Sequence, residues 1–224
     1  MRTTTESCHA CGSVTMKKRD LEVAVLAGGD SKRFKTDKPL ALFLGKPLIT
    51  HMLDIARRLS TKCTVVVSSD EQAERLRGLI GDAQVAVDPR NSPRCALTGA
   101  LTAFEFSRAK YVLLLPVDTP RASVDLLEII ADLAEGHGAV VPSWPSGNIE
   151  PLHASYHSEH AYAKGLMVAE SGKSRMQDLL SVLRNVLYIS TTALEQFDPE
   201  LRTFSNINTE QDLRELEKKG TRRS

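Results

Sequence analysis

Short apolar runs alternate with helix-like segments four times in the first part of the chain, and this alternation restricts the fold more than any other feature. The runs are residues 23–26, 64–68, 83–87 and 111–115. Each is continuously apolar, as in strands that are covered on both faces. The segments between them are long enough to hold a crossover helix. The pattern predicts a Rossmann-like, three-layer α/β/α fold with a mostly parallel, doubly wound sheet.

Helical patterns follow each of the four runs. Apolar residues recur at helical spacing in the first of these segments. Asp70 is expected to cap the second helix and Gly81 to end it, and Ser123 is expected to cap the fourth. The four expected helices span residues 48–59, 70–81, 96–107 and 124–135.

The second half of the chain is less regular. Strands are expected in three places and helices in three others, with Thr209 as the cap of the last helix. The expected strands are residues 139–141, 152–156 and 186–190, the last at an edge of the sheet. The expected helices are residues 160–170, 176–183 and 210–219.

Length and charge limit the classes of function. A chain of 224 residues fits one α/β domain with a sizeable core. The formal net charge is +1, so no strong basic field would attract nucleic acid. No apolar run reaches the length of about 18 residues that suggests a membrane span. We therefore expect a cytoplasmic protein without nucleic-acid or membrane partners.

The first residues are polar and lack the apolar core of a signal peptide. We expect a disordered leader at 1–19, a single domain at 20–219 and a short tail at 220–224. Cys8 and Cys11 form a C-x-x-C pair in the leader. This pair supplies two of the four ligands that zinc needs, and no second pair follows. A leader without metal is favoured, and zinc binding stays an open alternative.

A glycine pair and a basic loop follow the first strand. The strand ends at Gly28 and Gly29, and cations that include Arg33 and Lys38 come next. Glycine has no Cβ, so the backbone can approach phosphate oxygens closely. Arg33 can form two parallel hydrogen bonds to a phosphate, and Lys38 offers a compact charge. The order favours a polyphosphate site, in a loop exposed until ligand binds. Neither G-x-x-x-x-G-K-[ST] nor G-x-G-x-x-G is present.

Acidic residues follow two later strands. Asp88 and Asp118 each come directly after an apolar run, as Gly28 does. Carboxyl ends of parallel strands share one edge of a sheet, so these residues are expected to converge on one rim. Asp118 suits Mg²⁺, which prefers oxygen ligands and substrate phosphates, although it could instead cap the Thr-Pro turn that follows. Replacement of Asp118 by Asn is expected to lower activity and leave stability unchanged or slightly higher, because two carboxylates at one rim repel each other.

Four segments together resemble one enzyme family. They are L-A-G-G-x-S-x-R…D-K…G-x-P-L-I at 26–49, L-P-x-D-T-P at 115–120, E-P-L-H-A-x-Y at 150–156 and N-I-N-T at 206–209. This set is similar to the molybdenum cofactor guanylyltransferases, whose sheet is of the nucleotide-diphospho-sugar transferase type. Two positions depart from the family pattern. Lys35 replaces a usual glycine, and Cys95-Ala96 replaces a usual Gly-Pro pair.

The resemblance implies Mg²⁺-dependent transfer of GMP from GTP to the molybdopterin-bound molybdenum cofactor, with release of pyrophosphate. It also implies transient contact with enzymes that make or receive the cofactor. Catalytic roles fall to Arg33, Lys38 and Asp118, with Asp118 as the metal ligand. The residues implied at the nucleotide are Leu26, Ala27, Gly28, Gly29, Lys38, Asp88 and Asp118.

Several alternatives stay open. The nucleotide substrate could be CTP instead of GTP, or the acceptor could be another phosphorylated molecule. The two departures motivate a third hypothesis, a non-catalytic nucleotide-binding protein. Asp88 could hold the turn before a proline instead of a nucleotide. His153 is expected to be a packing residue and not a general base. Asn206 and Asn208 could bind the acceptor or hold a turn.

Overall fold

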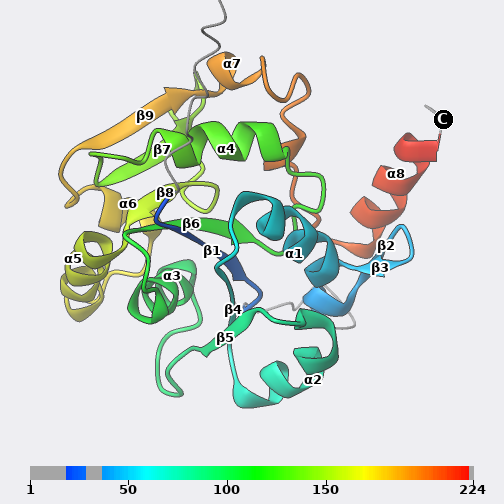
Figure 1. Cartoon of the computed structure of the whole chain (residues 1–224), viewed down its shortest axis with the longest axis horizontal. Helices are drawn as coiled ribbons and strands as arrows, with labels where there is room; N and C mark the ends of the chain where they lie inside the picture. Colours follow the sequence, from blue (N-terminus) through cyan, green and yellow to red (C-terminus); the bar gives the residue numbers. More distant parts are fainter. Residues whose placement is uncertain (1–18, 29–36, 222–224) are drawn as a thin grey trace, which may run out of the picture.

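The computed structural model describes residues 19–28 and 37–221. Its main feature is one seven-stranded sheet with the order β5-β4-β1-β6-β8-β7-β9 (Figure 1). The strands are β1 (Leu21–Leu26), β4 (Cys63–Val67), β5 (Gln84–Val87), β6 (Tyr111–Pro116), β7 (Ala139–Ser143), β8 (Ser155–His157) and β9 (Val186–Ser190). All neighbours pair in parallel except β8, which is antiparallel to both β6 and β7. The predicted mostly parallel, doubly wound sheet is confirmed, with 111–115 in its central strand and 186–190 at one edge.

Helices cover both faces of the sheet, which gives three layers (Figure 1). One face carries α1 (Leu48–Leu59), α2 (Asp70–Ile80) and α4 (Val124–Asp132), and the other carries α3 (Ala96–Phe106), α5 (Ser158–Glu170) and α6 (Met176–Leu180). Successive side chains of a strand point to opposite faces. Val23 and Val25 of β1 therefore enter the first core, whereas Ala24 and Leu26 enter the second. Burial on both faces explains why the strands are continuously apolar.

The remaining elements are short or terminal. A hairpin of β2 (Leu42–Phe43) and β3 (Lys46–Pro47) leads into α1. Near the end of the chain come α7 (Thr191–Leu194) and α8 (Glu210–Thr221). Two 3-10 turns complete the set, η1 (Lys38–Leu40) and η2 (Arg202–Phe204).

Several predicted boundaries were wrong, among them the end of the helix expected at 176–183, which stops at Leu180. Ser69, and not Asp70, caps α2, because its hydroxyl accepts the Gln72 N–H at 3.2 Å and leaves Asp70 as the first helical residue. The strand expected from residue 152 begins at Ser155, since a turn places the His153 N–H on the Glu150 carbonyl. The helix predicted to reach residue 135 ends at 132, where the chain turns toward β7.

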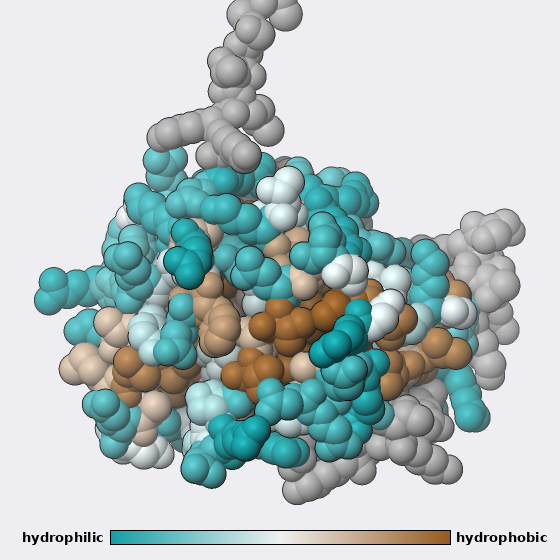
Figure 2. All heavy atoms as spheres, turned by 60° about the horizontal axis from the view of Figure 1, so that its bottom comes forward, coloured by the Kyte–Doolittle hydropathy of each residue, from teal (hydrophilic) through white to brown (hydrophobic). Residues whose placement is uncertain are grey.

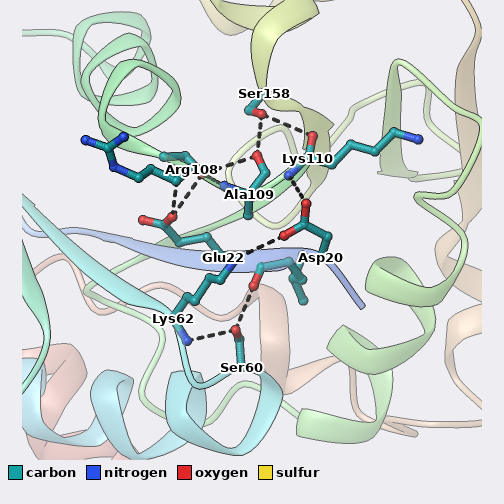
Figure 3. A network of polar contacts seen from close by, with 10 residues as sticks. Asp20, Glu22, Ser60, Lys62, Arg108, Ala109, Lys110 and Ser158 are labelled. Carbon is teal, nitrogen blue, oxygen red and sulfur yellow. Dashed lines mark hydrogen bonds and ion pairs between the residues drawn. The ribbon is translucent and has the colours of Figure 1, made fainter. Parts of the chain in front are cut away.

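Polar contacts, partly buried and partly exposed, tie the amino-terminal ends of the strands together (Figure 3). Glu22 of β1 is 5% exposed and accepts hydrogen bonds from the hydroxyls of Thr64 at 2.5 Å and Ser107 at 3.0 Å. Beside it, Asp20 accepts from Lys62 Nζ at 2.9 Å, and this bond lowers the pKa of Asp20. The carboxylates of Asp20 and Glu22 thus hold β1 and β4 in register with each other and with the residues just before β6.

Within 19–28 and 37–221, no helix is long and apolar enough to cross a bilayer. One face shows hydrophobic residues near its middle with hydrophilic residues around them (Figure 2). The expected leader lies outside the described residues apart from Arg19, and the helix α8 runs through the first two residues of the expected tail.

Candidate functional site

The carboxyl ends of β1 and β6 form the centre of the candidate site. These strands are parallel neighbours, and the Val117 N–H donates to the Leu26 carbonyl at 3.1 Å just beyond the last ladder pair. From β1 the chain winds outward through β4 and β5, and then returns to β6 on the other side of β1. Ligands of open α/β sheets bind at such a switch point, beyond the carboxyl ends of the strands.

An ion pair occupies this switch point. Lys38 Nζ lies 2.6 Å from Asp118 Oδ2, and their side chains are only 17% and 16% exposed. The two residues are 80 positions apart in the sequence. The expectation that Lys38 lies in an exposed loop was therefore wrong, because Lys38 begins η1 and turns its ammonium group toward the end of β6.

The second carboxylate oxygen of Asp118 has a different environment. Oδ1 is buried and makes no hydrogen bond within the described part of the chain. A buried carboxylate oxygen without a partner is costly, so a ligand that supplies a cation or a donor would stabilise it. A hard oxygen donor of this kind fits Mg²⁺. The described residues include no cluster of three or more His, Cys, Asp or Glu side chains, so a metal here would need substrate oxygens and water as further ligands.

Segments from the second half of the chain contact Asp118 and the residue that follows it. The Ile207 N–H donates to the Asp118 carbonyl at 2.9 Å. His153 Nε2 lies 3.2 Å from Thr119 Oγ1, and the His153 ring packs edge-on against Phe204 at 5.3 Å. His153 is 1% exposed, and burial lowers its pKa to about 3. It is a neutral packing residue, as predicted, and it also orients the turn after Asp118.

The segment around Ile207 leads into α8 through a series of backbone hydrogen bonds. Asn206 and Asn208 are exposed. The Asn208 backbone N–H donates to Asp212 Oδ2 at 2.8 Å, and Asp212 also accepts the Thr209 N–H. Thr209 Oγ1 in turn accepts the Asp212 N–H at 3.1 Å, so Thr209 caps α8 as predicted. The backbone of this segment thus holds Asp118 and starts α8.

Gly28 and Asp88 come together at the ends of β1 and β5. A Cβ added to Gly28 would lie 3.2 Å from the Ser68 nitrogen and 3.4 Å from Asp88 Oδ2. A side chain at this position would therefore be crowded, and its neighbours would have to shift by a few tenths of an ångström. Thr102 donates its hydroxyl to Asp88 Oδ1 at 2.7 Å, while burial raises the Asp88 pKa. The predicted convergence of Gly28, Asp88 and Asp118 on one rim agrees with this arrangement of strand ends.

The backbone before the basic loop is already hydrogen-bonded. The N–H groups of Ala27 and Gly28 both donate to the Val66 carbonyl, at 2.8 and 3.0 Å. Leu26 turns its side chain into the second core. Any role of these residues at a nucleotide must therefore come from their shape and carbonyl groups. Gly29, Arg33 and Lys35 lie outside the described residues.

Comparisons with known proteins agree with this geometry. The family model described as MobA-like NTP transferase domain matches residues 23–186, which is most of the chain. The chain belongs to this family. A relative named probable molybdenum cofactor guanylyltransferase, from Pyrococcus horikoshii, is 33% identical over 86% of this chain and 97% of its own length. Another of the same name, from Methanosarcina mazei, is 28% identical over 86% and 88%.

A solved structure also resembles this chain. Molybdopterin-guanine dinucleotide biosynthesis protein A from Archaeoglobus fulgidus superimposes with a TM-score of 0.77 at 27% identity, and the match covers 90% of this chain and 99% of that one. The protein is thus a nucleotidyltransferase of the MobA-like family. The predicted family, enzyme class and nucleotide-diphospho-sugar transferase fold are confirmed.

One residue of this MobA-like site was missed from the sequence. Gln72 on α2 is 4% exposed and uses both ends of its amide group. Its Oε1 accepts from the Ser68 N–H at 2.9 Å, and its Nε2 donates to the Ala27 carbonyl at 3.2 Å and to Asp37 Oδ1 at 2.9 Å. Gln72 thereby fixes Asp37, the residue before Lys38, to the end of β1. The signal was the S-x-x-Q pattern that begins at residue 69, a helix-start signature directly after a strand.

Proposed function

We propose that the protein transfers GMP from GTP to the terminal phosphate of the pterin-based molybdenum cofactor and releases pyrophosphate. The names of the relatives support this choice of donor and acceptor. The observation that carries the proposal is the Lys38–Asp118 pair at the switch point, with a buried carboxylate oxygen that makes no hydrogen bond to the described residues. This pair would bring one cation, and one carboxylate able to hold a metal, to the point where two phosphorylated substrates meet.

The chemistry needs positioning and charge neutralisation. An oxygen of the acceptor phosphate forms a bond to the α-phosphorus of GTP, and the bond from that phosphorus to the oxygen that bridges the α- and β-phosphates breaks, so that oxygen leaves with pyrophosphate. The acceptor phosphate is an anion at neutral pH, so no strong general base is required. His153, which lies next to the turn that follows Asp118, is buried and neutral, and so it does not need to act as a base. Lys38 binds phosphate oxygens and offsets the negative charge that develops on the leaving group.

Asp118 is the residue that would hold Mg²⁺, through the oxygen that Lys38 does not contact. The metal supplies neutralisation of phosphate charge when bound. Lys38 keeps the Asp118 side chain in place by its contact with the other oxygen. Asp88 and Gly28 form the wall of the nucleotide site on the β1–β4–β5 side.

The decisive experiment compares the four NTPs. The purified protein is incubated with Mg²⁺, the molybdenum-bearing pterin and one NTP at a time, and both pyrophosphate and the dinucleotide product are measured. We expect product with GTP and at least tenfold less with the other NTPs. Preference for CTP would keep the chemistry and replace the donor. Nucleotide binding without pyrophosphate in any combination would favour a non-catalytic protein.

A further inference from the structure

An open cleft lies on the same rim of the sheet as Asp118, beyond the carboxyl end of β7. It has a volume of about 640 Å³, and its walls include Trp144, Asn148 and Glu150 from the segment after β7 and Gln177 from α6. β6 and β7 point the same way because each is antiparallel to β8. The cleft therefore opens toward the side of the sheet on which Asp118 lies.

A tryptophan and a carboxylate are joined within this cleft. Trp144 Nε1 donates to Glu150 Oε1 at 2.7 Å, which fixes both side chains. The Glu150 side chain is 25% exposed, and burial raises its pKa. Partial desolvation makes a carboxylate a stronger hydrogen-bond acceptor, and its two oxygens can accept more bonds than the indole supplies. Glu150 thus retains capacity to accept from a ligand.

Packed rings connect the cleft to the reaction centre. Trp144 packs edge-on against Phe204 at 5.7 Å, and Phe204 packs against His153, which contacts Thr119 beside Asp118. Two strand spacings, or roughly 10 Å, separate β7 from β6. A molecule with its phosphate at Asp118 and a flat ring about that far away would reach the cleft.

The two halves of the sheet offer different surroundings to two substrates. Gly28 and Asp88 lie on the β1–β4–β5 half, which forms the wall of the proposed nucleotide site. The cleft lies on the other half, and Asp118 stands at the boundary. Because the donor and the acceptor must meet at Asp118 from different directions, the cleft suits the acceptor.

We propose that this cleft binds the 2-amino-4-oxo-pteridine ring of the acceptor, with the Glu150 carboxylate accepting hydrogen bonds from the ring N–H and the neighbouring amino group. Trp144 provides an aromatic surface beside the same ring. The inference rests on the proposed function for the identity of the acceptor. Two parallel N–H donors match a carboxylate, whereas a ring with a carbonyl in place of the amino group would meet it with like partial charges.

A binding experiment tests the cleft without catalysis. Trp144 is the single tryptophan of the chain, so its fluorescence reports on this place alone. We expect 6-hydroxymethylpterin to quench the emission in a saturable way and GTP to leave it unchanged. Lumazine, which has a carbonyl where pterin has the amino group, should bind at least tenfold more weakly. Equal quenching by both compounds, or none by the pterin, would overturn the proposal.

Kinetics with variants separate this inference from the proposed function. Glu150→Gln retains an acceptor for the Trp144 N–H but presents an amide N–H to the ring. The KM for the acceptor should rise about tenfold to a hundredfold, the scale of a lost hydrogen bond to a charged group, with the KM for GTP unchanged. Glu159→Gln, at an exposed position on α5, is the matched control.

The outcomes are distinct. Normal dinucleotide formation with an unchanged acceptor KM in Glu150→Gln would refute the cleft and leave the proposed function intact. A raised KM for GTP would show that Glu150 contacts guanine, whose edge carries the same donors, and would also refute the proposal. Saturable pterin quenching without transfer from any NTP would support the cleft and refute the proposed function.

Discussion

Exchange of Asp118 for Asn separates the metal-binding role of this residue from its role in the turn. Asparagine keeps the size and the turn-forming ability of aspartate and removes its charge. An amide is a much poorer ligand for Mg²⁺. Loss of one such electrostatic contact in an active site costs on the order of 3 kcal/mol of transition-state stabilisation, or about a hundredfold in rate. We expect that loss in kcat/KM, together with a weaker apparent affinity for magnesium.

The ion pair changes the expected effect on stability. The sequence suggested that removal of an unliganded anion would leave stability unchanged or raise it. The structure places Lys38 Nζ 2.6 Å from Asp118 Oδ2 at side-chain exposures near one sixth. A charged hydrogen bond of this kind contributes roughly 1.5–3 kcal/mol to the free energy of unfolding. Asparagine could still accept a weaker hydrogen bond from Lys38 through its amide oxygen. We therefore expect a loss of about 1–2 kcal/mol, which corresponds to roughly 2–8 °C in Tm for a domain of this size.

Pyrophosphate release is measured across a magnesium titration, and Tm is measured without ligands. Asp125→Asn, at an exposed position in the first turn of α4, is the matched control and should change neither quantity much. A double-mutant cycle with Lys38→Met isolates the contribution of the ion pair. Equal rates at saturating magnesium, with the same apparent affinity for magnesium, would remove Asp118 from the mechanism and leave only the turn.

Three further predictions concern stability and domain limits. Gln72→Leu should lower the free energy of unfolding by about 3 kcal/mol in urea titrations, because buried partners lose their hydrogen bonds, whereas Gln84→Leu, at an exposed position of β5, should not. His153 takes up its proton only in the unfolded state between pH 6.5 and about 3, so stability should fall with decreasing pH by about 1.4 kcal/mol per unit in this window. His153→Gln should remove that part of the slope, and an unchanged slope would contradict the assignment. Removal of residues 1–15 keeps every described element and should preserve activity; stoichiometric zinc that is lost together with activity would contradict this.

Local patterns predicted much of the fold. The helix over Leu48–Leu59 has the predicted limits because apolar residues at helical spacing meet a single core. The edge strand at Val186–Ser190 was also predicted correctly. Errors arose where a few side-chain contacts decide the boundary. Ser69 and Asp70 are both good caps, and only the bond from Gln72 shows which one acts.

The contacts that make the site were beyond local patterns. Lys38 and Asp118 were each predicted to act at the site, but their ion pair joins residues that lie far apart in the chain. The contact between His153 and Thr119 depends in the same way on the position of a three-residue antiparallel strand, which sequence periodicity does not reveal. Such contacts follow from tertiary packing, and single-sequence patterns report only on neighbours along one element.

Asp118 is attached to both halves of the sheet, and this attachment matters for a reaction between two phosphorylated substrates. Val117 binds the Leu26 carbonyl on the β1 side, while Ile207 binds the Asp118 carbonyl from the carboxyl-terminal segment. His153, from the turn before β8, holds the next residue, Thr119. A carboxylate fixed from both directions keeps its position when either substrate binds or leaves. Because transfer depends on alignment of the reacting phosphates more than on acid–base chemistry, rigid support at this boundary is the property that the fold must supply.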